Sequence, residues 1–136
     1  MPAKKDSRGM LSNGRKAGTG TFLRAPHDLF VHPDYLALSK PARAFLWDFG
    51  SQYQYRKNNG NLSAAPSIMA AYGYSKPTIH RLVRELLLYD WIRVTRTPMH
   101  PRQCYLYALS WIDLDDWGGD PILDVGARSM RKKALR

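Results

Sequence analysis

The chain is poor in cysteine, in acidic residues and in long apolar runs, and these shortages exclude several classes of protein. Cys104 is the only cysteine among 136 residues. Neither an internal disulfide framework nor a zinc site built from several cysteines of one chain is therefore possible. No apolar run is long enough to span a bilayer, and the N-terminus lacks the apolar core of a secretory signal. We expect a cytoplasmic protein.

Motifs that support catalysis or metal binding are also missing. The four histidines never fall at metal-ligand spacing with a convincing second ligand. There is no Gly-rich phosphate loop, Gly-x-Ser-x-Gly elbow or paired-histidine nickase motif. Asp113, Asp115 and Asp116 resemble a metal cluster, but beside Trp111 and Trp117 they are more typical of a solvated strip. We expect no enzyme activity, cofactor, metal, membrane contact or small-molecule substrate.

Positive charge is what the chain has in excess. Lys and Arg number 21 against 11 Asp and Glu, a net charge of +10 at pH 7. Such an excess by itself indicates an anionic partner, such as nucleic acid or a membrane surface. Residues 1–24 carry six basic residues and one acidic residue, and residues 124–136 carry five and one. Residues 56–102 carry eight basic residues and two acidic ones, so the middle of the chain is basic as well.

Composition divides the chain into three parts. Residues 1–21 are rich in Gly, Ser, Lys and Arg, which predicts a disordered basic arm. Residues 22–117 contain most of the periodic apolar pattern and predict one domain. Residues 118–136 predict a basic, disordered C-terminal tail. At the start of the domain we expect an extended lead-in over Phe22 to Val31, followed by a helical turn in "HPDYLALS".

The first long helix is predicted to begin after Ser39 and to run to about Tyr55. Ser39 is a good N-cap, and Pro41 falls in the first turn, where a missing N–H costs little. Apolar residues then recur at helical spacing. The predicted buried face consists of Ala42, Phe45, Leu46, Phe49 and Tyr53.

A short helix and a second long helix are predicted to follow. The short one lies in "APSIMAAYG", with Ile68, Met69 and Tyr72 facing inward, and Gly73 ends it because glycine accepts a left-handed conformation. The long one covers residues 76–89. Its predicted apolar arc consists of Ile79, Leu82, Val83, Leu86 and Leu87. Leu88 falls on the polar side, so either the helix ends before it or a partner covers it.

A β-hairpin is predicted after the helix 76–89. "WIRVTRT" and "CYLYALSW" alternate like strands, and "PMHPRQ" supplies the turn; Leu62 is expected in a further, very short strand. Arg93 and Arg96 are separated by an odd step, so we expect them on opposite faces and choose Arg96 to face a duplex. With His100 and Arg102, Arg96 would contact the DNA backbone or minor groove.

The polar face of the helix 76–89 carries the candidate base contacts. Arg81 and Arg84 lie opposite the apolar arc, with His80 near the margin. Arginine can reach the acceptors of guanine in the major groove, which the N-terminal half of such a helix enters. A charged helix face is more often simply solvated. The preceding short helix and the following basic hairpin favour the groove-reading interpretation here.

Phosphate contacts are predicted at two further places. Ser75, Lys76 and Thr78 lie at the start of the helix 76–89, where free N–H groups and the helix dipole favour a phosphate; Ser75 can equally serve only as a cap. Arg56 and Lys57, beside "NNGN", either contact phosphate or solvate a loop, and the sequence does not decide between these.

The order of helix, short helix, glycine turn, basic helix and basic hairpin resembles the winged helix-turn-helix family. In particular, "HPDYLALSKPARAFLWDF", "NNGNLS", "LVRELLLYDWI" and "YLYALSW" look like the small winged-helix proteins of prophages and plasmids. The resemblance implies an α+β fold with a three-helix core and a C-terminal hairpin wing. The DNA-binding positions that it implies are Lys76, Thr78, His80, Arg81, Arg84 and residues 96–102.

From the residues and the resemblance we expect a protein that binds double-stranded DNA in a sequence-specific manner. It would be a transcriptional regulator or replication accessory factor of a phage or plasmid, cytoplasmic and nucleoid-associated. Because one such domain covers a small site, a homodimer is expected, with Phe22 to Phe30 and Trp111 to Trp117 as candidate surfaces. The alternatives are an RNA-binding or ribonucleoprotein component and a protein–protein adaptor.

Overall fold

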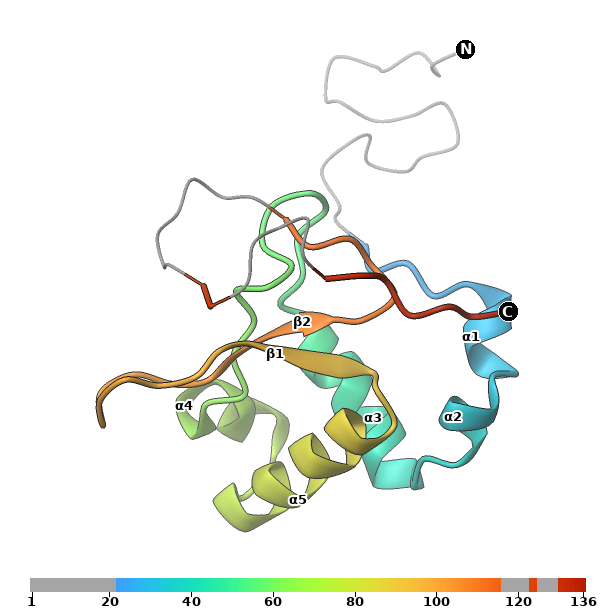
Figure 1. Ribbon diagram of the computed structural model, residues 1–136. Coiled ribbons are helices and arrows are strands. Elements are labelled where there is room, and N and C mark those ends of the chain that lie inside the picture. Colours follow the sequence, from blue (N-terminus) through green and yellow to red (C-terminus); the bar gives the residue numbers. More distant parts are fainter. Residues whose placement is uncertain (1–21, 116–122, 125–129) are drawn as a thin grey trace, which may run out of the picture.

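The computed structural model describes residues 22–115, 123–124 and 130–136, and over these ranges the fold is α+β (Figure 1). The predicted arm, residues 1–21, lies outside the described residues, as do Trp117 and Asp116. Short helices precede and follow the first long helix, and a two-stranded antiparallel sheet ends the series. In chain order the elements are α1 (His27–Phe30), α2 (Pro33–Leu36), α3 (Lys40–Gly50), α4 (Pro66–Met69), η1 (Ala70–Tyr72), α5 (Lys76–Leu88), β1 (Ile92–Arg96) and β2 (Leu106–Leu109).

Helix α3 confirms the predicted start and the predicted buried face. The Oγ of Ser39 accepts a hydrogen bond from the backbone N–H of Ala42 at 3.3 Å, and all five residues of the predicted face are buried. The helix ends at Gly50, earlier than predicted. There the Ser51 hydroxyl donates to the Asp48 carbonyl at 2.6 Å, which competes with continuation of the helix.

The short predicted helix consists of two pieces, α4 and η1, and Gly73 ends it with φ 88, as predicted. Its predicted inward face is only partly right. Met69 is fully buried, but Ile68 is 37% and Tyr72 is 46% exposed. For Tyr72, the change from α-helical to the tighter 3₁₀ winding after Met69 rotates the side chain away from the arc that a regular helix would bury.

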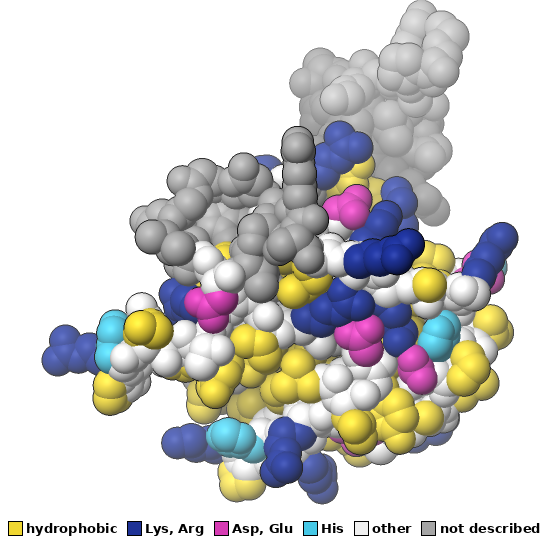
Figure 2. Space-filling view, in the orientation of Figure 1, with side chains coloured by type: hydrophobic (Ala, Val, Ile, Leu, Met, Phe, Trp, Pro, Cys, Tyr) yellow, Lys and Arg dark blue, Asp and Glu magenta, His cyan; other side chains and the backbone are white. Residues whose placement is uncertain are grey.

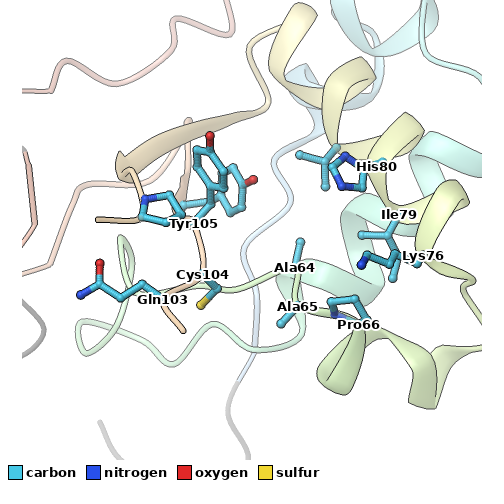
Figure 3. A pocket seen from close by; sticks show the side chains of 12 residues that line it. Ala64, Ala65, Pro66, Lys76, Ile79, His80, Gln103, Cys104 and Tyr105 are labelled. Atoms are coloured by element: carbon cyan, nitrogen blue, oxygen red, sulfur yellow. The ribbon is translucent and has the colours of Figure 1, made fainter. Parts of the chain in front are cut away.

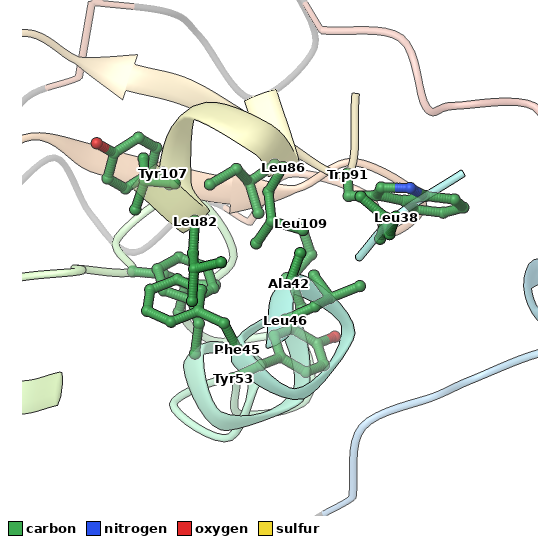
Figure 4. Close-up of a cluster of buried hydrophobic side chains, with 14 of the residues drawn as sticks. Leu38, Ala42, Phe45, Leu46, Tyr53, Leu82, Leu86, Trp91, Tyr107 and Leu109 are labelled. Atoms are coloured by element: carbon green, nitrogen blue, oxygen red, sulfur yellow. The ribbon is translucent and has the colours of Figure 1, made fainter. Parts of the chain in front are cut away.

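Helix α5 packs its apolar arc against α3 and the sheet (Figure 4). Its residues Ile79, Leu82, Val83 and Leu86 are buried, and Leu87 is half-buried. Leu88 belongs to the helix and is 76% exposed. The helix therefore does not end before Leu88, which leaves this apolar side chain on the surface of the described structure.

The hairpin pairs β1 with β2, and Leu62 adds an isolated bridge to Tyr107 on the other edge of β2. A bulge at Thr95 interrupts the alternation of β1. Consequently Arg93 lies opposite Ala108 and Arg96 lies opposite Leu106. Since alternate residues of β2 share a face, Arg93 and Arg96 lie on the same face, and the prediction of opposite faces is wrong.

Residues 130–136 lie along the domain, where the sequence predicted a disordered tail; residues 118–122 and 125–129 fall outside the described ranges. The backbone N–H of Lys133 donates to the Ser110 carbonyl at 2.7 Å. Its Nζ lies 2.5 Å from Asp34 Oδ2 and 5.0 Å from the Trp91 ring centre. Leu135 packs against the core. In Figure 1 this segment, in red, lies on the side of the sheet away from α5.

Trp111, which the sequence placed in a candidate dimer surface, is part of the core of the domain. It is 7% exposed, and its ring lies edge-on to those of Trp47 and Trp91. Its Nε1–H donates to the Arg24 carbonyl at 2.9 Å, which holds the lead-in segment on the domain. The lead-in itself is extended only to Pro26, because α1 begins at His27.

No helix within the described ranges has the length and apolar character needed to cross a membrane.

Candidate nucleic-acid interface

The outer face of α5 gathers the predicted groove-reading residues. Lys76, His80, Arg81 and Arg84 are all exposed, and together with Pro77 they line one shallow depression. This arrangement follows from helical spacing, because residues three and four apart share a face. Their predicted juxtaposition on one surface is confirmed.

At the start of α5 the Ser75 side chain does not cap the helix. Ser75 has the extended backbone of an N-cap, but its hydroxyl donates to Thr78 Oγ1 at 2.9 Å. The first turn of a helix leaves N–H groups without intrahelical partners, and the positive end of the helix dipole lies there. An anion such as a phosphate would find donors at this position.

Both acidic residues of the basic block 56–102 form hydrogen bonds with other residues of the domain. Glu85, on α5, accepts hydrogen bonds from the N–H and Oγ of Ser39 at 2.6 and 2.8 Å. Asp90 accepts from Arg93 Nε at 2.8 Å, and this hydrogen bond with the guanidinium lowers the pKa of Asp90. By contrast, no ion pair involving Lys76, Arg81 or Arg84 is found within the described ranges.

The hairpin carries its exposed cation, Arg102, at the tip and not along the strands. Arg96 is half-buried, and its Nη2 donates to the Cys104 carbonyl at 2.8 Å, across the hairpin. His100 and Arg102 are exposed in the turn. The turn is held by hydrogen bonds of its own, among them His100 Nδ1 accepting from the Arg102 N–H at 3.3 Å. Arg96 thus ties the strands together, and the tip provides the accessible charge.

A hollow of about 270 Å³ separates α5 from the hairpin. Figure 3 shows Lys76 and His80 on its helix side, and Gln103, Cys104 and Tyr105 on its hairpin side. Its floor is apolar, formed by residues such as Ile79, Val83 and Tyr107. Figure 2 shows Lys, Arg and His side chains over α5 and over the hairpin tip, with mainly uncharged surface between them. Basic side chains thus occur on both elements, but the hollow itself is lined by Lys76 on the helix side and by uncharged residues on the hairpin side.

Arg56 and Lys57 are not brought to this surface. They lie in the α3–α4 loop (residues 51–65), on the side of the domain away from α5 (Figure 1). The side chain of the fully buried Asn59 bonds this loop to residues 109–113. Arg56 lines a different hollow, together with Arg24 and Lys132. The predicted site is thus divided over two faces.

Two features of the interface were not predicted from the sequence. Tyr105, 46% exposed, borders the hollow, and its ring stacks on Tyr107 with centroids 6.2 Å apart. Strand alternation does place these two tyrosines on one face, but it does not reveal that α5 lies opposite. The engagement of Glu85 by Ser39 is the second feature, and no local pattern connects these residues.

Within the described ranges no group of three or more His, Cys, Asp or Glu side chains is placed to hold a metal ion. Asp115 Oδ2 accepts from the Asn59 N–H at 2.9 Å, and Asp113 lies 3.5 Å from Lys132. Burial is the main cause that raises the pKa of Asp115.

Comparisons with protein-family models, with curated proteins and with solved structures found no match to this chain.

Proposed function

We propose that this chain is a winged helix-turn-helix protein that binds double-stranded DNA in a sequence-specific manner. Helix α5 would enter the major groove, and the hairpin would serve as the wing against the backbone. The element order supports this assignment: α3, the Leu62 bridge, the α4–η1 pair, the Gly73 turn, α5 and then the hairpin. In such folds the helix after the turn is the recognition helix.

The distribution of charge is the observation that carries the proposal. The basic side chains Lys76, Arg81 and Arg84 of α5 and Arg102 of the hairpin tip face solvent, while Glu85 and Asp90 are bound within the domain. A duplex placed across this surface would meet these cations, and Glu85, the one carboxylate on α5, is half-buried with both oxygens held by Ser39. Phosphate contacts from such cations contribute affinity, and Arg81 and Arg84 would supply base contacts.

The biological role in this proposal is that of a transcriptional regulator or replication accessory factor of a phage or plasmid. It rests on the resemblance of the sequence to small winged-helix proteins of those elements. A homodimer forms part of the proposal. One recognition helix covers only a short DNA site, and the two recognition helices of a dimer would contact two such half-sites.

Selection of bound fragments from random duplexes, followed by fluorescence anisotropy on the selected site, tests the proposal. Arg81→Ala and Arg84→Ala should each weaken binding by about 1–3 kcal/mol, that is about 5-fold to 150-fold, and should leave the fold intact. Arg136→Ala is the matched control, because it removes the same charge from the C-terminal segment, where Arg136 is 89% exposed.

Three outcomes decide between the candidate functions. Wild-type affinity in both α5 variants would show that α5 does not enter the groove. Tighter binding of structured RNA than of the selected duplex at matched salt would favour a ribonucleoprotein component. Binding to a protein partner without steep salt dependence, and without duplex affinity, would favour an adaptor.

A further inference from the structure

On the face away from α5, two exposed aromatic rings lie against each other. Phe22 and Tyr55 stack with ring centroids 6.4 Å apart and planes 19° from parallel. Phe22 is 67% and Tyr55 is 47% exposed, so neither ring contributes its full area to the core. Exposed aromatic faces are the surfaces on which unpaired bases stack in proteins that bind single-stranded nucleic acid.

Three cations surround these rings. Arg24, Arg56 and Lys132 line a hollow of about 240 Å³ together with Phe22 and Tyr55. The Arg56 guanidinium lies over the Tyr55 ring, 5.0 Å from its centre. Figure 2 shows Lys and Arg side chains gathered on this side of the molecule, around the C-terminal segment. Cations beside stacking rings are the arrangement that neutralises the phosphates of a strand whose bases occupy the rings.

Two carboxylates share the hollow, and each has a partner. Asp113 lies 3.5 Å from the Lys132 Nζ, and Asp115 accepts the backbone N–H of Asn59 at 2.9 Å. Three cations against two engaged carboxylates give the hollow a net positive charge. The hollow therefore favours a negatively charged strand over a positively charged ligand.

The backbone of the α3–α4 loop holds Arg56 beside Tyr55. Arg56 has φ 58, in the left-handed region that few residues other than glycine adopt. Its N–H donates to the Tyr53 hydroxyl at 3.4 Å, and the Asn58 side chain accepts the Gln54 N–H at 2.7 Å. These bonds hold the backbone conformation that places Arg56 next to Tyr55, and the guanidinium then lies over the ring.

We infer that Phe22 and Tyr55, with Arg24, Arg56 and Lys132, form a second nucleic-acid site that binds an unpaired strand. Bases stack on the two rings, and the cations contact the neighbouring phosphates. A duplex is a poor occupant, because its base faces are already stacked on one another. Arg56 was predicted from the sequence as a phosphate contact, but the site uses none of the α5 and hairpin residues proposed to bind the duplex, so it stands or falls independently of that proposal.

Fluorescence anisotropy of the full-length protein with a labelled oligodeoxythymidylate of about ten nucleotides tests the inference. Tyr55→Ala should weaken binding of this oligonucleotide by about 5-fold to 150-fold, the effect of losing one stacked base. Phe22→Ala should act in the same direction. Tyr55→Phe, which keeps the ring, should bind like wild type. Neither Tyr55 variant should change affinity for the selected duplex; because Phe22 lies within a candidate dimer surface, Phe22→Ala is compared on the oligodeoxythymidylate alone.

A reciprocal set of variants separates the two sites. Arg81→Ala should weaken duplex binding and leave the oligodeoxythymidylate affinity unchanged. If Arg81→Ala lowers both affinities equally, the single strand binds on α5 and the inference is overturned. It is also overturned if Tyr55→Leu binds like wild type, because an aliphatic side chain covers the surface without stacking, or if Tyr55→Ala and Phe22→Ala have no effect. Equal or tighter binding of oligouridylate, with the same loss in Tyr55→Ala, supports the site and assigns RNA as its strand.

Discussion

Glu85 of α5 completes the N-terminal cap of α3 by accepting two hydrogen bonds from Ser39. Its carboxylate oxygens lie 2.6 Å from the Ser39 nitrogen and 2.8 Å from the Ser39 Oγ. Ser39 in turn accepts the Ala42 N–H. In a capping box the acid three residues after the cap makes the return bond, but Ala42 occupies that position here. A residue of another helix supplies the carboxylate, and the two helices are thereby joined.

Removing this carboxylate should destabilise the domain without harming the proposed duplex-binding surface. Glu85→Ala should lower the free energy of unfolding by about 1–3 kcal/mol, because Ser39 loses a charged acceptor. Duplex affinity should stay the same or rise, since a negative charge leaves α5. Urea denaturation measures the first effect and anisotropy the second. A double-mutant cycle with Ser39→Ala should show coupling; simple additivity would contradict the pairing.

Asn59 should be among the most sensitive positions for stability. Its Nδ2 donates to the carbonyls of Leu109, Ile112 and Asp113, and its Oδ1 accepts the Leu109 N–H at 2.8 Å. Asn59→Ala leaves these buried groups without partners and should cost about 2–4 kcal/mol in urea denaturation. The neighbouring Asn61→Ala, at a half-buried position, is the control. Equal effects of the two substitutions would argue against the special role of Asn59.

Tyr74 should ionise late in an alkaline titration. Burial, followed by its hydrogen bond to Asp48 at 2.6 Å, raises the pKa of Tyr74 to about 12. Because the folded state binds this proton more tightly than the unfolded state, its stabilising contribution is complete below pH 10.0 and is lost as the pH rises through about 12. Tyr74→Phe should remove one tyrosine from the alkaline end of an ultraviolet absorbance titration. An unchanged alkaline end would contradict this assignment.

Burial also raises the pKa of Tyr107 to about 12, so Tyr107→Phe provides an independent measure of the same late phase. Tyr107 lies on the floor of the hollow between α5 and the hairpin. The two substitutions should therefore each reduce the late phase by a similar amplitude, and the double variant should reduce it further; burial also raises the pKa of Tyr53, which remains in that variant.

The docked C-terminal segment should contribute to stability through Lys133. The Lys133 side chain is 8% exposed, pairs with Asp34 and lies over Trp91. Lys133→Ala should lower the free energy of unfolding by about 1–2 kcal/mol and should change Trp91 fluorescence. Arg136→Ala is the control, because its pair with Asp28 is exposed and should contribute little. If Lys133→Ala unfolds at the same urea concentration as wild type, the segment does not support the domain.

The long helices were the most predictable elements. The spacing of Phe45, Leu46 and Phe49 and the cap at Ser39 specified α3, and Gly73 marked the turn before α5. These features depend on neighbours within a few residues, so the sequence displays them directly. The α4–η1 face was less predictable, because a short helix that changes winding does not keep one period.

The candidate interface was predictable only where one helix carries it. Lys76, His80, Arg81 and Arg84 share a face because helical geometry is regular. The position of Arg96 was not predictable, since the bulge at Thr95 depends on the bond from its hydroxyl to the Gly60 carbonyl, 2.5 Å away in another loop. Likewise, nothing local indicates that Phe22 and Tyr55 meet.

By itself, the sequence determined the order of the helices and the hairpin, the buried arcs and the cationic face of α5. Short-range periodicity, caps and turn residues specify these features. Only the tertiary structure decided which charges are accessible. It bound Glu85 to Ser39, moved Arg56 to the opposite face and laid Lys133 against Trp91. Each of these outcomes depends on which surfaces the packed core brings within hydrogen-bond or van der Waals distance, and that information lies in the fold and not in any single stretch of residues.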